Sequence, residues 1–194
     1  MDTPGWILLI PLLVAIAGLL WWSLRGTGSS DNGMIAVGKS LPAFTCQHED
    51  GTTVSTDTLR GQRVVMLFVR GSWCPFCSEQ VQSLTDHYRH ISDVGGKLII
   101  ITRRPLSTTQ RVADQFNVPF EFWLDKNLAA AQQLQLVDEQ TIPDRFHDDF
   151  GRRTIRPTVL VIDRDGVIRY SHRASKPSDR PDPARFMSVF DGLD

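Results

Sequence analysis

The chain has 194 residues, a formal net charge of −1 at pH 7 and a hydrophobic fraction of 41%. The nearly balanced charge excludes a strongly basic surface of the kind that binds nucleic acid, so we expect no nucleic-acid partner. The hydrophobic fraction is ordinary for a globular domain with a packed core.

An uncharged apolar segment lies close to the N-terminus. Residues 6–24 carry no charged side chain, and a helix of that length spans about 30 Å of hydrocarbon. Trp21 and Trp22 stand near its end, where aromatic rings favour the membrane interface. A cleaved signal peptide is the alternative, but the basic stretch that normally precedes its apolar part is missing. We therefore predict one transmembrane helix within a single-pass membrane anchor, residues 1–25.

The side of the membrane on which the rest of the chain lies stays open. Arg25 follows the apolar segment and no Lys or Arg precedes it, which favours a cytoplasmic over a periplasmic domain. One arginine does not decide between them. Residues 26–37 are mainly small and polar and predict a flexible linker, and residues 38–194 have the size of one domain.

Strand and helix patterns alternate through the first half of this domain. Residues 41–46 and 52–54 flank Asp50-Gly51 and predict a small hairpin. Continuous apolar runs at 64–69 and 97–102 predict central parallel strands that are buried on both faces. Between them, one helix is predicted from Pro75 to Gly95-Gly96, with a buried face at spacings of three and four formed by Val81, Leu84, Tyr88 and Ile91.

The second half continues the alternation and ends with a hairpin and a helix. We predict helices at 107–116 and 127–136, strands at 120–124, 158–163 and 167–171, and a last helix that Asp182 and Pro183 begin. Asp138-Glu139 and residues 144–149 are interpreted as solvated loop charge. The order predicts an α/β fold in which helices flank a central mixed β-sheet.

The segment Trp73-Cys74-Pro75-Phe76-Cys77 carries the chemistry of the chain. It places two thiols two residues apart where the first central strand gives way to a helix. At a helix N-terminus, unpaired backbone N–H groups and the helix dipole favour a thiolate over a thiol. Since the thiolate is the reactive form of cysteine, the pattern predicts thiol redox chemistry at Cys74 and Cys77.

Two other uses of a cysteine pair have weaker support. A four-cysteine zinc site within the chain is excluded because Cys46 is the only other cysteine, and no histidine belongs to a ligand-like pair. A static structural disulfide usually closes a longer loop. We therefore expect no metal and no cofactor other than a redox-active Cys74–Cys77 disulfide. A non-catalytic metal-binding or interaction module remains an alternative.

A second feature lies far along the chain, where Arg156-Pro157-Thr158 leads into the strand at 158–163. A cis bond before Pro157 would bring its backbone beside the two cysteines. The order of strand, Trp-Cys-x-x-Cys, helix and a distant Pro-Thr before a hairpin resembles the thioredoxin superfamily. This resemblance implies a thioredoxin-like fold in which Trp73, Pro157 and Thr158 support the cysteines.

The closer resemblance is to the peroxiredoxin-like AhpC/TSA (redoxin) group. It rests on the order of several short motifs, namely Leu41-Pro42-Ala43-Phe44, Asp50-Gly51, Leu59-Arg60-Gly61-Gln62, residues 69–77, Leu124-Asp125, residues 157–166 and Asp179-Arg180-Pro181-Asp182-Pro183. The resemblance implies a hydroperoxide or disulfide substrate. It also implies a thiol electron donor such as a thioredoxin-like reductant.

The resemblance leaves open which cysteine attacks the substrate. Typical peroxiredoxins have Thr or Ser three residues before the peroxidatic cysteine, which would make Cys77 peroxidatic and puts Cys74 in the place of the hydroxyl. A thioredoxin-like mechanism makes Cys74 the exposed nucleophile and Cys77 the shielded resolving thiol, and the positions on the helix favour this assignment for disulfide exchange. Arg70 and Arg156 are the cations nearest in sequence that could stabilise a departing hydroxide.

The leading hypothesis is thus a membrane-anchored, thiol-dependent peroxide reductase. Protein disulfide exchange at the membrane is the second hypothesis. Cys46, in a predicted strand, is expected to be a small core residue, with a role as redox partner as the alternative.

Overall fold

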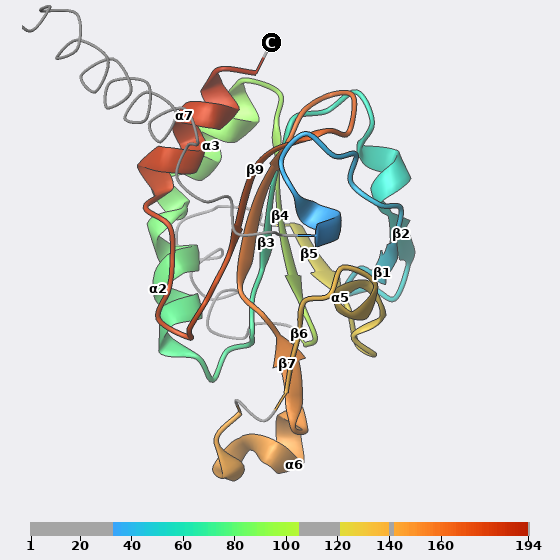
Figure 1. The fold of residues 1–194 in the computed structure, drawn as a ribbon, viewed down its shortest axis with the longest axis vertical. Coiled ribbons are helices and arrows are strands. Elements are labelled where there is room, and N and C mark those ends of the chain that lie inside the picture. Colours follow the sequence, from blue (N-terminus) through green and yellow to red (C-terminus); the bar gives the residue numbers. More distant parts are fainter. Residues whose placement is uncertain (1–32, 105–120, 140–141, 194) are drawn as a thin grey trace, which may run out of the picture. The chain divides into compact units, whose positions relative to one another are not determined.

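The computed structural model describes residues 33–104, 121–139 and 142–193. Its centre is a seven-stranded mixed sheet in the order β2-β1-β5-β4-β3-β8-β9, seen nearly edge-on in Figure 1. The prediction of an α/β fold with a central mixed sheet and flanking helices is confirmed.

The strands of this sheet are short. They are β1 (Thr45–Gln47), β2 (Thr53–Ser55), β3 (Val64–Phe68), β4 (Lys97–Thr102), β5 (Glu121–Leu124), β8 (Thr158–Ile162) and β9 (Ile168–Arg173). A separate two-stranded sheet consists of β6 (Val137–Glu139) and β7 (Arg153–Ile155). The α-helices are α2 (Pro75–Ser83), α3 (Thr85–Asp93), α5 (Ala129–Gln133), α6 (His147–Phe150) and α7 (Pro183–Asp191), and the 3₁₀ turns are η1 (Gly33–Ile35), η2 (Thr56–Leu59) and η3 (Asp144–Phe146).

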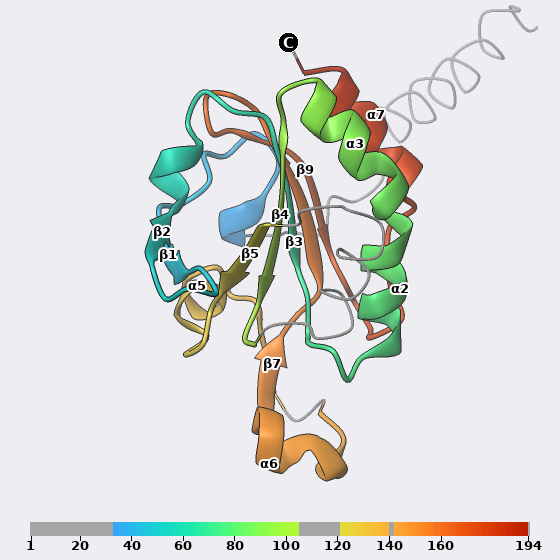
Figure 2. The ribbon, with the colours of Figure 1, turned by 180° about the vertical axis from the view of Figure 1, so that it is seen from behind.

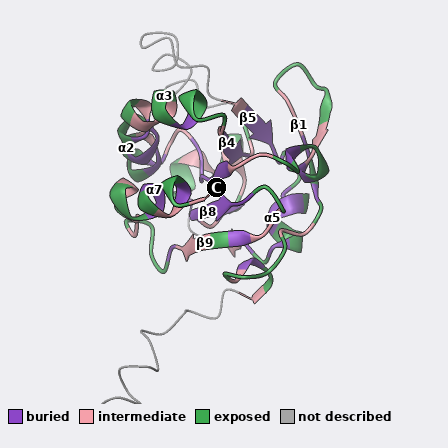
Figure 3. Cartoon of the chain, turned by 90° about the horizontal axis from the view of Figure 1, so that it is seen from above, coloured by how far each residue is buried: buried purple, intermediate pink, exposed green. Residues whose placement is uncertain are grey.

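The strand β3 lies inside the sheet, between β4 and β8. It pairs in parallel with β4 and antiparallel with β8, and every residue of β3 and β8 is buried. Figure 3 shows this buried centre with the exposed surfaces of the helices around it. Because side chains alternate across a strand, β3 contributes to a hydrophobic cluster on each face. Val64, Met66 and Phe68 belong to one cluster, and Val65 and Leu67 belong to the other.

Different elements cover the two faces of the sheet. The helices α2, α3 and α7 pack on the face of Val65 and Leu67, and Figures 1 and 2 show them together on one side. On the opposite face, α5 and the strand β1 contribute to the cluster of Val64 and Phe68. The sheet therefore separates two hydrophobic clusters, one on each face.

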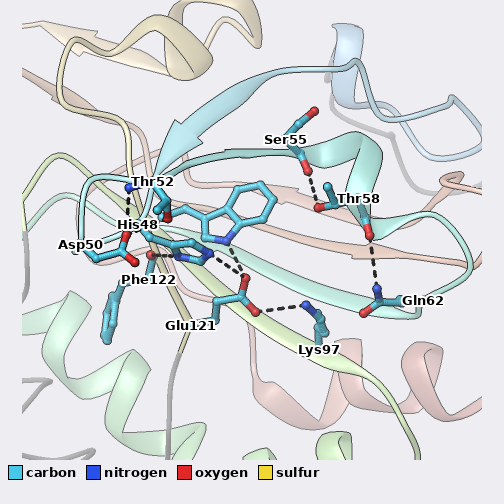
Figure 4. A network of polar contacts seen from close by, with 10 residues as sticks. His48, Asp50, Thr52, Ser55, Thr58, Gln62, Lys97, Glu121 and Phe122 are labelled. Carbon is cyan, nitrogen blue, oxygen red and sulfur yellow. Dashed lines mark hydrogen bonds and ion pairs between the residues drawn. The ribbon is translucent and has the colours of Figure 1, made fainter.

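A polar network fastens the edge hairpin to the sheet, as Figure 4 shows. The carboxylate of Glu121 accepts hydrogen bonds from Trp123 Nε1 (2.8 Å) and Lys97 Nζ (3.4 Å). His48 lies 3.9 Å from the same carboxylate, and its Nδ1 lies 3.4 Å from the Phe122 carbonyl oxygen. These contacts join β1 to β5 and β4.

Most predicted elements within the described residues are confirmed, with three differences. The predicted hairpin is β1–β2, and the predicted strands at 64–69, 97–102 and 158–163 are β3, β4 and β8. The single predicted helix is divided into α2 and α3, since Leu84 N–H bonds to Val81 O in a tighter 3₁₀-like turn. The helix predicted at 127–136 is only Ala129–Gln133, because Leu128 and Gln135 on either side have positive φ.

The third difference is the β6–β7 hairpin, which was interpreted as loop. Its strands pair antiparallel from Val137 with Ile155 to Glu139 with Arg153. Polar side chains and short length hide such strands from a hydrophobic pattern. In Figure 1 this hairpin and α6 project from one end of the sheet.

The folded unit begins earlier than the predicted domain boundary at residue 38. It starts at Gly33, and Ile35, which is fully buried, belongs to the core cluster that includes Phe44 and Leu59. The segment 26–37 is therefore not a linker along its whole length. The predicted anchor at 6–24 and the predicted helix at 107–116 lie outside the described residues. Among the residues that are described, no helix has the length and apolar character needed to cross a membrane.

Candidate active site

The two neighbouring cysteines lie at the point where the chain leaves β3 and enters α2. Cys74 is the N-cap residue of α2, Pro75 is its first residue, and Cys77 lies in its first turn. The turn before the helix is closed by a hydrogen bond from Cys74 N–H to Gly71 O (3.2 Å). Gly71 has φ +146°, and a Cβ there would lie 3.0 Å from Trp73 Nε1. This glycine therefore allows Trp73 to fold back over the turn.

Both sulfur-bearing side chains are buried. Cys74 is 1% exposed and Cys77 is 0% exposed, and both belong to the cluster that also contains Val69 and Val159. The expectation of an exposed Cys74 is therefore wrong for this state of the protein. The reason is that the helix start is pressed against the end of the sheet, so the N-cap side chain packs inward with its neighbours.

The two thiols interact, and the interaction lowers the pKa of one and raises the pKa of the other. All three cysteines of the chain are free. A hydrogen bond from the Cys77 thiol, helped by the Cys77 backbone N–H and by the charges of Arg70 and Arg180, lowers the pKa of Cys74 to about 6, against the effect of burial. The same thiol–thiol hydrogen bond and burial raise the pKa of Cys77 well above its usual value. At neutral pH the pair is thus a Cys74 thiolate beside a protonated Cys77.

Two arginines contact this pair. The backbone N–H of Arg70 donates to Cys77 Sγ (3.4 Å), and its guanidinium carbon lies 4.5 Å from the centre of the Trp73 ring. Arg180 Nη2 donates to Cys77 Sγ over 3.3 Å, and its Nη1 donates to Asp179 O (2.8 Å). The positive charges favour a thiolate in the pair.

Sequence reasoning missed Arg180 as a site residue. The segment Asp179–Pro183 carried part of the family resemblance, but the residue is 103 positions from Cys77. No spacing rule connects residues so far apart. Only the way the loop between β9 and α7 returns to the start of α2 brings the guanidinium to the sulfur.

Arg156 does not lie beside the cysteines with Arg70 and Arg180. Its Nη2 forms an ion pair with Asp138 on β6 (3.7 Å), and its backbone N–H donates to Leu136 O. The interactions of Arg156 thus tie β7 to β6 and the segment before it. Of the two arginines that the sequence put forward, the structure brings Arg70 to the cysteines.

Pro157 and Thr158 lie at the same end of the sheet as the cysteines. Thr158 opens β8 and pairs with Phe68, two residues before Arg70, and both Pro157 and Thr158 are buried. The cis bond considered before Pro157 is not present, since the described residues contain no cis peptide bond. Strand pairing between β3 and β8 is enough to bring this segment beside the turn.

Trp73 packs against the hairpin that the sequence did not predict. Its ring centre lies 5.9 Å from that of Phe146 and 6.4 Å from that of Phe150. Arg103 Nη1 donates to the carbonyl oxygens of Phe150 and Arg153, which fixes this segment to the end of β4. The hairpin therefore forms one wall beside the cysteine turn.

Cys46 lies on the other face of the sheet. It is 5% exposed in β1, in the cluster of Phe44 and Trp123. Burial and the charge of Asp125 raise its pKa to about 12, so it stays a thiol at neutral pH. Its packing is that of a small core residue. Within the described residues, no group of three or more His, Cys, Asp or Glu side chains could hold a metal ion.

The chain has relatives among known proteins. Residues 37–171 match the AhpC/TSA family. The chain is 26% identical over 134 residues to a Coxiella burnetii protein named as a peroxiredoxin, bcp, covering 69% of this chain and 85% of that protein. It is 28% identical over 174 residues to the thiol:disulfide interchange protein DsbE of Escherichia coli K12, covering 86% and 84% of the two chains.

Solved structures show the same fold. Reduced Prx3 of Vibrio vulnificus in complex with H₂O₂ superposes with a TM-score of 0.66 at 17% identity, covering 81% of this chain and 99% of that one. Peroxidoxin BcpB of Mycobacterium tuberculosis superposes with a TM-score of 0.60 at 15% identity, covering 80% and 94%. Identities this low establish the thioredoxin-like fold alone.

Proposed function

Because the chain belongs to the AhpC/TSA family and is a thiol-dependent oxidoreductase, we propose that it reduces hydroperoxides through a dithiol–disulfide cycle of Cys74 and Cys77. The observation that carries the proposal is the buried Cys74–Cys77 pair at the start of α2, in which the Cys77 thiol and the charges of Arg70 and Arg180 lower the pKa of Cys74. A small hydroperoxide reacts through its terminal oxygen, so only this end of the molecule has to reach the buried sulfur. A folded protein disulfide needs a much wider opening.

The first step is attack by the Cys74 thiolate on the terminal oxygen of the hydroperoxide. An S–O bond forms, the O–O bond breaks, and the alkoxide or hydroxide departs and takes up a proton. The cationic groups of Arg70 and Arg180, whose charges act on Cys74, favour the negative charge that develops on the leaving oxygen. The product is a Cys74 sulfenic acid and an alcohol or water.

The second step is resolution by Cys77. Its sulfur, in hydrogen-bond contact with that of Cys74, loses its proton and attacks the sulfenic sulfur. An S–S bond forms and the sulfenic oxygen leaves as water. An external thiol donor then reduces the Cys74–Cys77 disulfide by two thiol–disulfide exchange steps. In this cycle Cys77 is the resolving thiol, although the family pattern aligns it with the peroxidatic position.

The experiment that tests the proposal follows hydrogen peroxide consumption by the full-length reduced protein under single-turnover conditions. The wild type is expected to consume about one peroxide per protein and to lose two thiols. Cys74→Ser should abolish the reaction, and Cys77→Ser should consume peroxide but stop at the sulfenic acid. A Cys74→Ser variant that consumes peroxide at the wild-type rate refutes the assignment of Cys74 as leading thiol.

Disulfide exchange is the second candidate, and one comparison favours it. The similarity to DsbE extends over 86% of this chain, and a Cys74 thiolate at a helix start with a protonated Cys77 behind it also suits attack on a disulfide. A parallel assay with a protein disulfide separates the two functions. Turnover of the disulfide without peroxide consumption would replace the first proposal by the second.

We propose further that residues 6–24 anchor the domain in a membrane as a single span. The support is the uncharged apolar stretch and the tryptophans at its end. Because Cys74 and Cys77 are buried, a bulky membrane-impermeant maleimide would label them slowly on either side of the membrane, unlike small reagents such as iodoacetamide. A cysteine introduced at Val37, which is 58% exposed, in a cysteine-free variant would report the side of the membrane. Labelling in intact cells by a membrane-impermeant maleimide indicates a periplasmic domain, and labelling only after lysis indicates a cytoplasmic one.

A further inference from the structure

A groove lies beside the cysteine pair, between α2 and the loop that precedes α7. We call it the α2 groove. It has a volume of about 290 Å³ and its lining includes Phe76, Glu79, Gln80, Arg180, Pro181 and Pro183. Arg180 connects this groove to the chemistry, because the same guanidinium donates to Cys77 Sγ over 3.3 Å. A ligand in the groove is thus one side chain away from the dithiol.

Two residues of the groove lining each carry a buried N–H group without a partner among the described residues. Gln80 is only 7% exposed, and neither its Nε2 nor Arg180 Nε has a hydrogen-bond partner in the parts of the chain that the structure describes. A buried donor without an acceptor costs about 1–3 kcal/mol. The terminal torsion of a glutamine is broad, so the amide of Gln80, a lining residue, has the freedom to rotate toward a ligand that offers an acceptor. A ligand with a hydrogen-bond acceptor would satisfy these donors.

The remaining lining defines the rest of such a ligand. Phe76 is 40% exposed although it is a large apolar side chain, and Pro181 and Pro183 add apolar surface. Arg180 supplies a positive charge and Glu79 a negative one. The lining therefore suits a small molecule with a carboxylate for Arg180 and Gln80, an ammonium group for Glu79 and a short apolar body between them.

We propose that the α2 groove binds the reductant of the Cys74–Cys77 disulfide, and that this reductant is a small thiol that carries carboxylate and ammonium groups. This inference rests on the proposed function, in which the oxidised form is an internal disulfide. Burial of both sulfurs favours a small reductant over a protein. The groove holds the charged body of the thiol while its sulfur reaches the disulfide.

The exchange balances with two molecules of the thiol. The thiolate of the first attacks Cys74 Sγ, the Cys74–Cys77 bond breaks, and Cys77 departs as a thiolate that Arg180 stabilises through its N–H. The thiolate of the second attacks the mixed disulfide at the sulfur of the bound small molecule and releases Cys74 as a thiolate. The small thiol is oxidised to its disulfide and the protein returns to the dithiol.

The test measures the second-order rate constant for reduction of the oxidised full-length protein by glutathione. Glutathione diethyl ester is the matched reductant, because it keeps the thiol and the ammonium group but lacks the free carboxylates. The wild type should react about tenfold faster with glutathione, after correction for thiol pKa, which is the effect of one hydrogen bond to a charged group. Gln80→Leu should reduce this preference severalfold, because only Arg180 is left to bind the carboxylate, and should leave the rate with the ester within about twofold.

Gln82→Leu is the control, because Gln82 is an exposed glutamine on the same helix outside the groove lining. It should keep the preference for glutathione. Equal rates with the two reductants in the wild type, or a preference that Gln80→Leu leaves unchanged, overturn the inference. Oxidation of each reduced variant by hydrogen peroxide is measured separately without any reductant. If the reduced wild type is not oxidised by hydrogen peroxide, this result counts against the proposed function and not against binding of the thiol in the groove.

Discussion

Arg180 Nη2 lies 3.3 Å from the sulfur of Cys77, across 103 positions of the chain. This contact joins the loop before α7 to the first turn of α2. It places a positive charge beside the Cys74–Cys77 pair, in which the pKa of Cys74 is lowered to about 6. The acidity of the pair therefore depends on a residue far from the cysteine motif.

Replacing Arg180 by methionine is expected to raise the pKa of Cys74. A nearby cation favours the thiolate, so its removal makes the proton harder to lose, and the midpoint of thiol reactivity moves up by about half a pH unit. The midpoint is measured from the rate of alkylation by iodoacetamide between pH 5 and 9. Arg185→Met, an exposed arginine on α7, is the control and should leave it in place. An unchanged midpoint in Arg180→Met would show that the charge does not act on the pair.

Replacing Cys77 by alanine should have a larger effect in the same direction. The hydrogen bond from the Cys77 thiol is the largest cause of the lowered pKa of Cys74. In the wild type, alkylation of Cys74 should increase as the pH rises through about 6. In Cys77→Ala the increase should occur at higher pH, nearer the ordinary cysteine value. A Cys77→Ala profile that coincides with the wild type contradicts the assignment of the thiolate to Cys74.

The sequence predicted the parts of the fold that depend on hydrophobic pattern and on local chemistry. The runs at 64–69 and 97–102 are buried strands because such runs satisfy both faces of a sheet. Asp182 caps the last helix as predicted, and its side chain accepts from Ala184 N–H (3.0 Å). The position of both cysteines at the start of α2 also follows from local signals.

The sequence could not predict features that depend on packing between distant segments. Burial of Cys74 depends on how α2 meets the sheet, and the role of Arg180 depends on the loop before α7. The β6–β7 hairpin was missed because its strands are short and polar, although Phe146 and Phe150 beyond them pack on Trp73. Arg156 was put forward from its position next to Pro157, but its partner is Asp138.

Gly71→Ala should destabilise the protein more than Gly51→Ala does. Both glycines have positive φ, but a Cβ at Gly71 lies 3.0 Å from the Trp73 ring whereas a Cβ at Gly51 meets nothing within 4 Å. We expect a loss of about 2–3 kcal/mol at Gly71 and about 1 kcal/mol at Gly51. The free energy of unfolding is measured by urea denaturation. Equal losses would mean that the contact with Trp73 carries no energy.

Phe146→Ala should loosen the hairpin wall beside the cysteines. The substitution removes an aromatic pair with Trp73 that contributes about 0.5–1.5 kcal/mol. Protease cleavage within residues 137–156 should become faster, and reaction of Cys74 with iodoacetamide should accelerate because one wall of the turn is lost. Phe76→Ala, in the lining of the α2 groove, is the comparison and should not change cleavage of the hairpin. No change in either measurement with Phe146→Ala would refute the proposed packing role.

Cys46→Ala should leave the redox cycle intact. Cys46 packs in the cluster on the opposite face of the sheet from Cys74 and Cys77, so the expected cost is about 1 kcal/mol of stability from a small cavity. Single-turnover peroxide consumption should stay within about twofold of the wild type. If consumption falls as it is expected to fall in Cys74→Ser, Cys46 takes part in the chemistry after all.

The most direct test of the central claim is the position of the first oxidised sulfur. The Cys77→Ser protein is mixed with one equivalent of hydrogen peroxide in the presence of dimedone, which reacts with sulfenic acids, and the labelled residue is identified by peptide mass spectrometry. Attack by Cys74 predicts the label on Cys74 in Cys77→Ser and no label on Cys77 in Cys74→Ser. A label on Cys77 in Cys74→Ser, together with an unlabelled Cys74 in Cys77→Ser, would contradict the account and make Cys77 the peroxidatic cysteine.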